Sequence, residues 1–389
     1  MDSECGKIAI IGGGAAGLYL AALFARAGLG GKVTLVEAGA RLGKKLSASG
    51  NGQGNVSHTD MSAAHYHGGG ARLAFDIITD TGDVLSLFGG IFTADDRGRI
   101  YPAGRQASAL TDDLRVKIER GGVTVMLNER VTGISRGFSL PLSGGGTLKA
   151  DTVVLACGGS AQKQFGTGGG SYALARSLGH EITPLFPSLV QLKTDTARIK
   201  TLKGLRTDAR VTAFSGSKPL GSGEGEIIFA DYGVTGSAVF AVSPKICGKT
   251  GVTLSVDLAP ALTETQISDD IARKLSAGCA ADKVLDLTFH RTLARAVLSA
   301  SPSRAEIART AKNFPLTVTG TLGFDHAQVT RGGVDMRGVT DKLESKTERG
   351  LFFAGEVLDV DGDCGGYNLH WAFASAKRVF DEIMRRRNI

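Results

Sequence analysis

The sequence predicts an α/β protein in which a dinucleotide-binding domain is interrupted by a β unit, which is itself interrupted by a helical unit. Three observations indicate this architecture. A strand, a glycine turn and a helix follow one another over residues 8–23, and a strand and a long helix close the chain over residues 350–386. Between them, the pattern changes from short strands to helices and back. The simplest explanation is nesting, with the last strand and helix rejoining the first domain.

The N-terminal turn has the spacing of a dinucleotide-binding fingerprint, because an apolar strand runs into GGGAAG at residues 12–17. In this pattern Gly12 permits a tight turn, Gly14 lets the backbone approach a pyrophosphate, and Gly17 lets the helix pack against the strand. The helix N-terminus offers free N–H groups and a positive dipole end to phosphate groups. The turn therefore predicts a nucleotide site, with a glycine turn that binds no nucleotide as the alternative. The positions expected at the phosphates are Gly12, Gly14, Ala15, Ala16 and Gly17.

An acidic residue ends the second strand. Residues 33–36 are followed by Glu37 and Ala38, about 20 residues beyond the glycine turn. At this distance the Glu37 carboxylate can accept hydrogen bonds from the hydroxyls of a ribose.

The next segment, residues 41–58, is rich in glycine, serine and asparagine and has no helical period, which predicts a long functional loop. Its lysines can follow an anionic cofactor, and its N–H groups and side-chain amides suit the nitrogen and oxygen edges of a flavin. A flexible surface loop is the alternative. The loop positions expected at the cofactor are Lys44, Lys45, Gly50, Asn51, Gly52 and Asn55.

The middle of the chain divides by its periodicity into parts rich in helices or in strands. Helices are expected at residues 71–88 and 108–120, and strands at 122–128, 131–140 and 147–155. Four positions in and after these strands are expected near the cofactor: Val131, Ala156, Gly158 and Gly159. Short strands are expected at 188–192, 210–214, 226–229, 252–258, 316–319 and 327–330, and helices after Thr263, which forms a capping box with Gln266, and at 289–298 and 303–311. The predicted domains are 1–186 with 334–389, 187–260 with 314–333, and the helical subdomain 261–313.

The C-terminal strand, expected at residues 350–354, is followed by a glycine, acids and a long helix, which is expected at residues 367–386. An acid just after a strand can hold ribityl hydroxyls, and a helix N-terminus can face the N1/O2 side of a reduced flavin. An ordinary strand–turn–helix is the alternative. The positions expected at the cofactor are Gly355, Glu356, Asp359, Gly366, Tyr367, Asn368 and Leu369.

Composition limits the class of protein. With 389 residues, 21% charged and 42% hydrophobic, the chain predicts a globular protein of two or three domains. It contains no run of about 18 apolar residues and no basic leader, so we expect no membrane partner and a cytoplasmic location. Five scattered cysteines argue against a disulfide framework and a zinc site. The net charge of +7 and the arginines at 385–387 indicate either a solvated helix end or a surface that faces a polyanion.

No set of acid–base residues stands out, so the catalytic side chains remain unassigned. His65 and His67 form an H-x-H pair without a further ligand, and no metal is expected. His370 in the last helix is interpreted as a satisfied or surface histidine. Cys364 is interpreted as a turn residue, with a redox or covalent-flavin role as the alternative. A flavin carries the redox chemistry itself, so few acids and bases are needed.

Taken together, these motifs resemble a family of bacterial flavoproteins known as NAD(P)/FAD-dependent oxidoreductases or aminoacetone-oxidase-family FAD-binding proteins. The resemblance covers nearly the whole chain and is most specific in GEVLDVDGDCGGYNLHWA at residues 355–372. It implies a Rossmann-like, glutathione-reductase-like domain that binds FAD, with an inserted β-barrel-like domain that carries a small helical subdomain. The other matching segments are residues 10–17, 43–55, 156–159, 166–170, 178–180, 233–236, 329–334 and 344–346. The implied cofactor-lining residues are Gly12, Gly14, Gly17, Glu37, Lys45, Asn51, Asn55, Gly355, Asp359, Asn368 and Leu369.

The sequence departs from the family pattern at two places. The family loop often reads GNGRCN, whereas residues 50–55 read GNGQGN and lack the arginine and the cysteine. The family's Thr-His pair is replaced by Ala230 and Asp231, so this chain is open to a different substrate.

Three functions remain open. The first is an FAD-dependent oxidoreductase that transfers hydride between flavin and a small molecule, with NADH or NADPH as a transient donor, because a second dinucleotide fingerprint is absent. The second is reduction of uridine in ribosomal RNA, a known activity in the family; the low aromatic content of 6% and the lack of an RNA-binding module do not favour it. The third is a flavin-binding redox sensor without catalysis. The substrate and the oligomeric state are not specified by the sequence.

Overall fold

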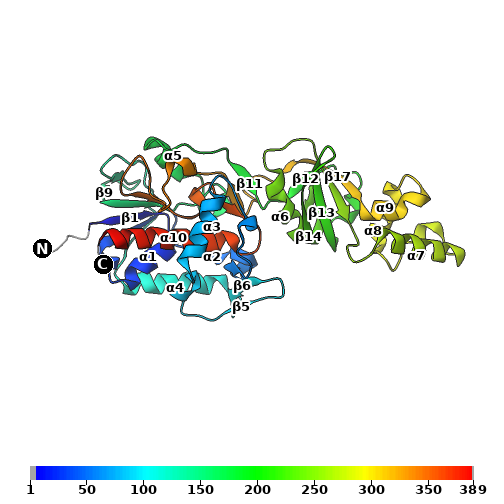
Figure 1. Cartoon of the computed structure of the whole chain (residues 1–389), viewed down its shortest axis with the longest axis horizontal. Helices are drawn as coiled ribbons and strands as arrows, with labels where there is room; N and C mark the ends of the chain where they lie inside the picture. Colours follow the sequence, from blue (N-terminus) through cyan, green and yellow to red (C-terminus); the bar gives the residue numbers. More distant parts are fainter. Residues whose placement is uncertain (1–5, 388–389) are drawn as a thin grey trace. The chain divides into compact units, whose positions relative to one another are not determined.

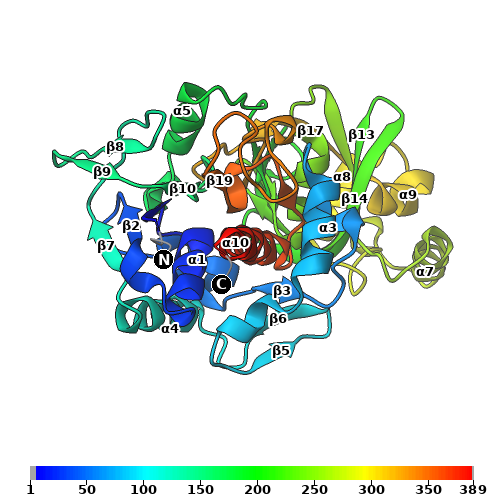
Figure 2. The same cartoon turned by 60° about the vertical axis from the view of Figure 1, so that its left-hand side comes forward.

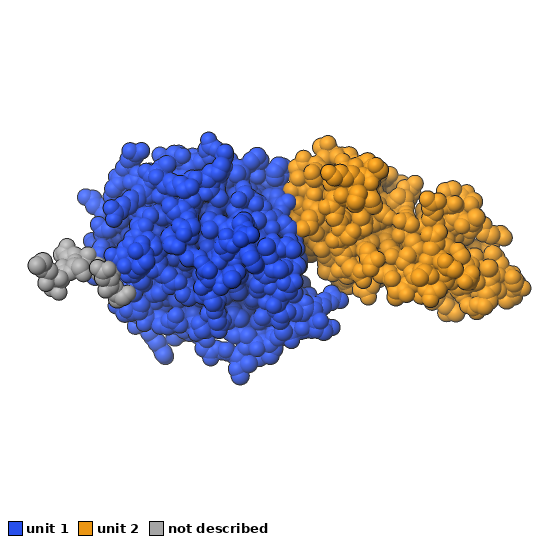
Figure 3. Space-filling view, viewed as in Figure 1, with its two compact units in different colours: residues 1–186, 329–389 blue, residues 187–328 orange. Residues whose placement is uncertain are grey.

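The computed structural model describes residues 6–387, which form two compact units (Figure 3). Unit 1 consists of Met1–Phe186 and Val329–Ile389, and unit 2 of Pro187–Gln328. The chain leaves unit 1 through Phe186–Ser188 (β11) and re-enters it with Val329–Arg331 (β18). By its contacts, the chain thus rejoins unit 1 at Val329, whereas the sequence pattern predicted that the first domain resumes at residue 334.

Unit 1 is built on a parallel sheet of five strands in the order β19-β10-β1-β2-β7. In register, Ile11 lies opposite both Val36 and Leu155, and Leu155 lies opposite Phe353. The carboxyl ends of four strands therefore lie level along one edge of the sheet. The strands are Ile8–Ile11 (β1), Val33–Glu37 (β2), Thr124–Leu127 (β7), Thr152–Leu155 (β10) and Leu351–Phe353 (β19).

Two helices from opposite ends of the chain pack together on this sheet. Helix α1 (Ala15–Arg26) and helix α10 (Tyr367–Arg386) lie side by side (Figure 2). The rings of Tyr19 and Phe373 lie 4.9 Å apart. Helix α10 has the bounds that its sequence pattern predicts, and the two terminal segments belong to one core, as nesting requires. The other helices of unit 1 are Ala71–Thr81 (α3), Ala107–Arg120 (α4) and Gly170–Ser177 (α5).

Three local predictions in unit 1 are wrong. Residues 41–58 are not an irregular loop, because they contain Lys44–Ser47 (α2), a 3-10 turn and Ser57–His58 (β3). The helix expected at 71–88 ends at Thr81, because Gly82 has a φ of +66°, which ends the helix.

The strand expected at 131–140 does not form either. Val131 makes only an isolated bridge to Leu142, and the backbone turns at Gly137 and Phe138, whose φ values are +73° and +53°. The observed strands are Ser139–Pro141 (β8) and Thr147–Lys149 (β9), which pair as a hairpin. The remaining short strands of unit 1 are Tyr66–His67 (β4), Phe92–Ala94 (β5), Arg99–Pro102 (β6) and Asp361–Gly362 (β20).

Unit 2 contains a closed barrel of antiparallel strands in the order β12-β15-β14-β13-β16-β17 (Figure 1). In β13, alternate residues Ala209, Val211 and Ala213 are fully buried, which is the period-2 pattern of a strand with one face in a core. The strands are Leu192–Thr194 (β12), Arg206–Ser215 (β13), Lys218–Ala230 (β14), Gly233–Thr235 (β15), Val252–Asp257 (β16) and Phe314–Thr321 (β17).

The helical part of unit 2 follows β16. The predicted capping box is confirmed: Thr263 Oγ1 accepts from the Gln266 N–H at 3.1 Å, and Gln266 Oε1 accepts from the Thr263 N–H at 2.8 Å. No helix among residues 6–387 has the length and apolar character needed to cross a bilayer. The helices of unit 2 are Ser237–Val242 (α6), Glu264–Ser276 (α7), Arg291–Ala300 (α8) and Ile307–Lys312 (α9).

Candidate functional site

The turns that follow four parallel strands meet at the carboxyl edge of the unit 1 sheet. Backbone N–H groups continue the ladder beyond the strands: Gly12 donates to Val36 at 2.8 Å, and Ala156 donates to Ile11 at 2.8 Å. The N–H group of Ala354 donates to Leu155 at 3.0 Å. The glycine turn, the Glu37 segment, the turn after β10 and the turn after β19 are thereby brought together. Ligands of open α/β sheets bind at this edge.

The three fingerprint glycines have different surroundings. Gly12 has a φ of +105°, and a Cβ there would lie 2.7 Å from the Ala156 carbonyl oxygen. A Cβ at Gly17 would lie 1.9 Å from the Gly12 carbonyl oxygen. At Gly14, in contrast, a Cβ would meet no atom within 4 Å. Gly12 and Gly17 are thus required by the protein itself, whereas Gly14 faces open space in front of the α1 N-terminus, where Ala15 and Ala16 begin the helix.

Glu37 fixes the turns on either side of it. Its Oε2 accepts from the Gly13 N–H at 2.8 Å, and its Oε1 accepts from the Gly39 N–H at 2.6 Å. Ala38 lies between Glu37 and Gly39. A carboxylate has about four acceptor positions, so capacity remains for ribose hydroxyls.

An ion pair joins the α2 segment to the turn after β19. Lys45 Nζ lies 2.8 Å from Glu356 Oε2, and Glu356 Oε1 accepts from the Thr330 N–H at 2.8 Å. Thr330 Oγ1 in turn accepts the N–H groups of Ser160 and Ala161 at 2.8 and 3.0 Å. Thr330 is therefore an anchor of the site that the residue patterns did not single out, although it lies in a segment that carried the family resemblance.

Two polar groups beside this ion pair are enclosed by the protein. Asp359 is buried and accepts the Gly69 N–H at 3.0 Å, and burial raises the pKa of its carboxyl group. The Tyr172 hydroxyl on α5 is buried without a hydrogen-bond partner among the residues that the structure describes. Burial and, secondarily, the charges of Glu356 and Asp359 raise the pKa of Tyr172. An unpaired buried hydroxyl is costly, so this corner of the sheet edge fits a ligand with hydroxyl groups.

The side-chain amides of Asn55 and Asn368, which were expected near the cofactor, are hydrogen-bonded to the protein backbone. Asn55 Nδ2 donates to the carbonyls of Ser57 and Ile100, both at 3.1 Å. Asn368 Nδ2 donates to the Gly362 carbonyl, and its Oδ1 accepts the Gly362 N–H, both at 2.8 Å. These side chains hold loops in place, which leaves the main chain to face a cofactor there. Gly50, Asn51 and Gly52 form a left-handed turn with φ values of +56°, +55° and +82°.

The start of α10 is tightly packed. A Cβ at Gly366 would lie 2.3 Å from the Ser57 carbonyl oxygen. The Gly355 N–H donates to Ser375 Oγ at 2.9 Å, which joins the turn after β19 to the helix. Tyr367 and Leu369 open the helix. His370 Nδ1 lies 2.8 Å from Ser57 Oγ, and burial lowers the pKa of His370 to about 4, so this histidine is a neutral, hydrogen-bonded core residue.

The four cysteines that the structure describes form no disulfide. Cys157, at the end of β10, donates to the Ile11 carbonyl at 3.1 Å, and burial raises its pKa to about 12, which keeps it a thiol. Cys364 is exposed and free, and Cys5 lies outside the described residues. Within residues 6–387, no three His, Cys, Asp or Glu side chains are arranged to hold a metal.

Three arginines near the C-terminus, Arg378, Arg385 and Arg386, are paired with carboxylates. Arg385 and Arg386 both contact the buried Glu382, at 2.8 and 2.6 Å. Arg386 also contacts Glu344 at 2.7 Å, and Arg378 contacts Asp80 at 2.8 Å. The structure thus favours a folded helix end over a free polyanion-binding surface.

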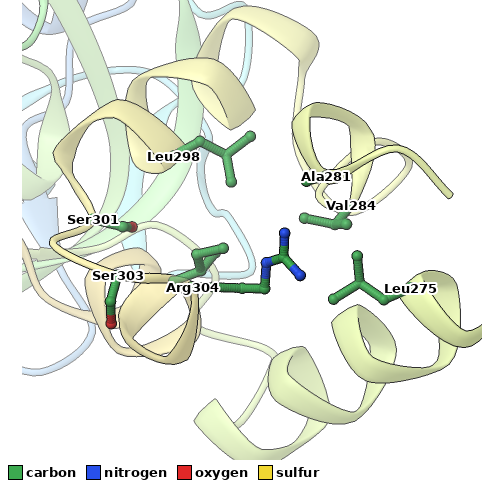
Figure 4. Close-up of a pocket in the computed structure, with 8 residues that line it drawn as sticks. Leu275, Ala281, Val284, Leu298, Ser301, Ser303 and Arg304 are labelled. Carbon is green, nitrogen blue, oxygen red and sulfur yellow. The ribbon is translucent and has the colours of Figure 1, made fainter.

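A hollow in the helical part of unit 2 lies outside this site. Figure 4 shows the Arg304 guanidinium among aliphatic side chains from α7, α8 and the turn between them. Its lining residues include no carboxylate, histidine or cysteine. The lining residues are Leu275, Ala281, Val284, Leu298, Ser301, Ser303, Arg304 and Ile307.

Comparisons with known proteins agree with this geometry. The model of the HI0933-like protein Rossmann domain matches residues 6–380. A 3-dehydro-bile acid delta(4,6)-reductase of Clostridium scindens is 36% identical, with 95% of this chain and 97% of the relative covered. A ribosomal RNA dihydrouridine synthase of Haemophilus influenzae is 26% identical, with 99% and 100% covered. The solved 3-ketosteroid delta1-dehydrogenase of Sterolibacterium denitrificans, 12% identical over 98% of this chain and 99% of that one, has a similar fold with a TM-score of 0.50.

Proposed function

The chain belongs to the HI0933-like Rossmann family and is an FAD-dependent oxidoreductase, and on this premise we propose that it reduces a carbon–carbon double bond conjugated with a carbonyl group. The two activities named for its relatives share this chemistry. A delta(4,6) double bond of a 3-dehydro-bile acid and the ring double bond of uridine are both conjugated with a carbonyl. The similarity that carries the proposal is the 36% identity to the bile acid reductase over nearly the whole of both chains.

The substrate that we favour is a small amphipathic molecule of the bile acid type. The dihydrouridine synthases are less similar, at 26% and 27% identity, and Arg385 and Arg386 near the C-terminus are paired with carboxylates. Reduction of uridine in ribosomal RNA is the second candidate, because those relatives also match at full length.

FAD fits the carboxyl edge of the unit 1 sheet. The observation that supports this placement is the open space in front of Gly14 at the N-terminus of α1, where the first-turn N–H groups can receive a pyrophosphate. Glu37 would hold the ribose of the adenosine half, and the start of α10 would face the flavin. When bound and reduced, FAD would supply the hydride for the reduction. The residues proposed to hold it are Gly12, Gly14, Ala15, Ala16, Gly17, Glu37, Ala38, Lys44, Lys45, Gly50, Asn51, Gly52, Asn55, Val131, Ala156, Gly158, Gly159, Gly355, Glu356, Asp359, Gly366, Tyr367, Asn368 and Leu369.

NADH or NADPH is the proposed electron donor, visiting the flavin transiently. The support is the single strand–glycine–helix fingerprint in the sequence, which leaves no dedicated second nucleotide domain. The scattered cysteines, which show no disulfide spacing, support a cytoplasmic location, where thiols stay reduced.

One experiment tests the electron donor, the favoured substrate and the second candidate function. The FAD-loaded enzyme is reduced anaerobically with NADH or NADPH, and the loss of flavin colour is followed. A 3-dehydro-delta(4,6) bile acid is then added to one sample and a ribosomal RNA fragment to another. We expect the bile acid to restore the flavin colour. Mass spectrometry should then show that the bile acid has gained two hydrogen atoms for each double bond that is reduced. Restoration by the RNA alone would support the second candidate, and restoration by neither would overturn the proposal.

A further inference from the structure

We propose that the hollow in the helical part of unit 2 binds an aliphatic carboxylate, a molecule with a carboxylate head and a short alkyl chain. This site is separate from the flavin site, because every residue that lines the hollow belongs to unit 2. Two features of the hollow point to this ligand. Its walls are aliphatic, and the Arg304 guanidinium extends between them (Figure 4).

The walls of the hollow come from four separate elements. Leu275 belongs to α7, Leu298 to α8 and Ile307 to α9, and Val284 follows the 3-10 turn between α7 and α8. Val284 and Ile307 are buried, and the two leucines are half-buried. An alkyl chain that displaces water from such a surface gains free energy in proportion to the apolar area covered.

The Arg304 guanidinium supplies the charge of the hollow. Among the described residues, no carboxylate forms an ion pair with it. Glu306, two residues further along the chain, lies 3.7 Å from Arg309 instead, and Asp282 in the turn after α7 is exposed to solvent. Arg304 is itself exposed, so an anion can reach it from solution. Two parallel N–H groups of a guanidinium match the two oxygens of a carboxylate, which makes this head group the best fit.

The two serines that line the hollow add little to the binding of a head group. Ser301 Oγ donates to the Val297 carbonyl at 2.7 Å, so its proton is already used. The Ser303 hydroxyl points away from the Arg304 guanidinium (Figure 4). Recognition of the charge therefore depends on Arg304.

The hollow is formed before a ligand arrives, because the turn that carries Val284 is held against α7. Lys274 Nζ donates to the carbonyl oxygens of Val284 and Asp286, at 3.1 and 2.8 Å. The same ammonium group lies 2.6 Å from the Asp270 carboxylate. A wall that is already ordered reduces the entropy that binding costs.

The size of the hollow limits the length of the alkyl chain. Its volume is about 230 Å³. A water molecule takes about 30 Å³ in the liquid, so the hollow holds about eight groups of that size. Hexanoate, with six carbons and two oxygens, matches this number. Pockets for drug-sized ligands measure about 300–1,000 Å³, so a whole bile acid exceeds the hollow.

A chain-length series tests the site in the full-length protein with FAD bound. Acetate, butyrate, hexanoate and octanoate are titrated and their Kd values are measured by ligand-detected NMR, with hexanol as the uncharged probe. Arg304→Gln removes the charge, and Ala281→Leu places a larger side chain into the hollow from an exposed position. Arg295→Gln is the matched control, since Arg295 is an exposed arginine of α8 that does not line the hollow. Thermal unfolding and sedimentation velocity of each variant are recorded in parallel.

We expect hexanoate to bind with a Kd of about 1 mM or below, and the affinity to rise about 4-fold for each methylene group up to hexanoate. Octanoate should gain no more than about 2-fold, because the hollow is then full. Arg304→Gln should weaken hexanoate at least about 10-fold and leave hexanol within about 2-fold. Ala281→Leu should weaken both molecules, and Arg295→Gln should weaken neither. Melting temperatures and sedimentation coefficients should stay those of the wild type.

Several outcomes would overturn the site. One is a wild type that binds no hexanoate at about 10 mM, and another is an affinity that does not depend on chain length. Equal losses in Arg304→Gln and Arg295→Gln would show that hexanoate responds to surface charge alone. A changed sedimentation coefficient in Arg304→Gln would assign the hollow to self-association instead. These measurements report binding in unit 2 and no turnover, so their failure leaves the proposed reduction unaffected.

Discussion

The two units bury different kinds of polar side chains. Among the described residues, the buried polar side chains of unit 2 are all hydroxyls, whereas unit 1 also buries histidines and carboxylates. Burying an ionisable group is costly unless it is hydrogen-bonded or paired, so such groups are retained where they serve structure or chemistry. The hydroxyls of unit 2 are Ser188, Thr194, Ser243 and Thr310, and the ionisable residues of unit 1 are His180, Glu344, Asp359, Asp361, His370 and Glu382. The contrast teaches that the buried ionisable groups of the described residues gather in unit 1, whereas the core of the unit 2 barrel is apolar apart from a few hydroxyls.

The largest expected effect comes from a variant that leaves a cavity in the core of the unit 2 barrel. Phe314 begins β17 and is fully buried. We expect Phe314→Ala to lower the free energy of unfolding of unit 2 by about 3–5 kcal/mol through lost burial and an unfilled cavity. Urea unfolding with FAD titration checks this. The FAD affinity of the folded protein should be unchanged, and a parallel loss of FAD affinity would contradict the proposed placement of FAD within unit 1.

A single glycine of unit 1 should show the opposite behaviour. A Cβ at Gly14 would meet no protein atom within 4 Å, and the side chain in Gly14→Val would enter the space proposed for the pyrophosphate. We expect FAD affinity to fall by about 100-fold, the equivalent of two lost charge-assisted hydrogen bonds.

The matched control for that change is Gly31→Val, since a Cβ at Gly31 also meets no atom within 4 Å but lies far along the chain from the turn. Equilibrium dialysis gives the affinities, and thermal unfolding of the flavin-free proteins should give similar midpoints. Full FAD binding by Gly14→Val would exclude the proposed phosphate position.

A paired carboxylate of unit 1 distinguishes structure from chemistry. Hydrogen bonds from Arg385 and Arg386 lower the pKa of Glu382 to about 2. Because its folded pKa is depressed, its stabilisation is complete above the unfolded value of about 4.3 and is lost as the pH falls from there toward about 2. We expect Glu382→Gln to cost about 2 kcal/mol at neutral pH and to flatten the acid limb of the stability profile. Unchanged acid stability would show that the pair contributes nothing.

The smallest expected effect concerns His370. Burial lowers its pKa to about 4. Between about pH 6.5 and about pH 4, His370 is therefore protonated in the unfolded chain and neutral in the folded chain. Stability should therefore fall as the pH falls through this window, by about 1 kcal/mol between about pH 7 and about pH 5.5. His370→Asn should remove that slope in urea titrations at each pH. A slope that persists in the variant would assign it to another group.

The sequence alone predicted the structural features that depend on residues close to one another in the chain. The roles of Gly12 and Gly17, the bounds of α10 and the Thr263 capping box follow from local spacing, and the structure shows the close contacts that require those two glycines. The strand expected at 131–140 failed because glycines within it permit a turn that hydrophobic periodicity does not reveal.

The rest of the site depends on contacts between distant segments. Lys45 and Glu356 are separated by 311 positions. No periodic pattern specifies which partner such a side chain finds, so the sequence did not predict that the amides of Asn55 and Asn368 bind backbone carbonyls. The unpaired Tyr172 hydroxyl likewise emerges only from packing.

The measurement that tests the central claim most directly is a calorimetric titration of the flavin-free protein with FAD. We propose that unit 1 binds one flavin at the carboxyl edge of its sheet, with the pyrophosphate in front of Gly14. We therefore expect a single binding event per chain and a yellow protein, with binding much weakened in Gly14→Val. A chain that releases no heat with FAD and stays colourless would contradict it.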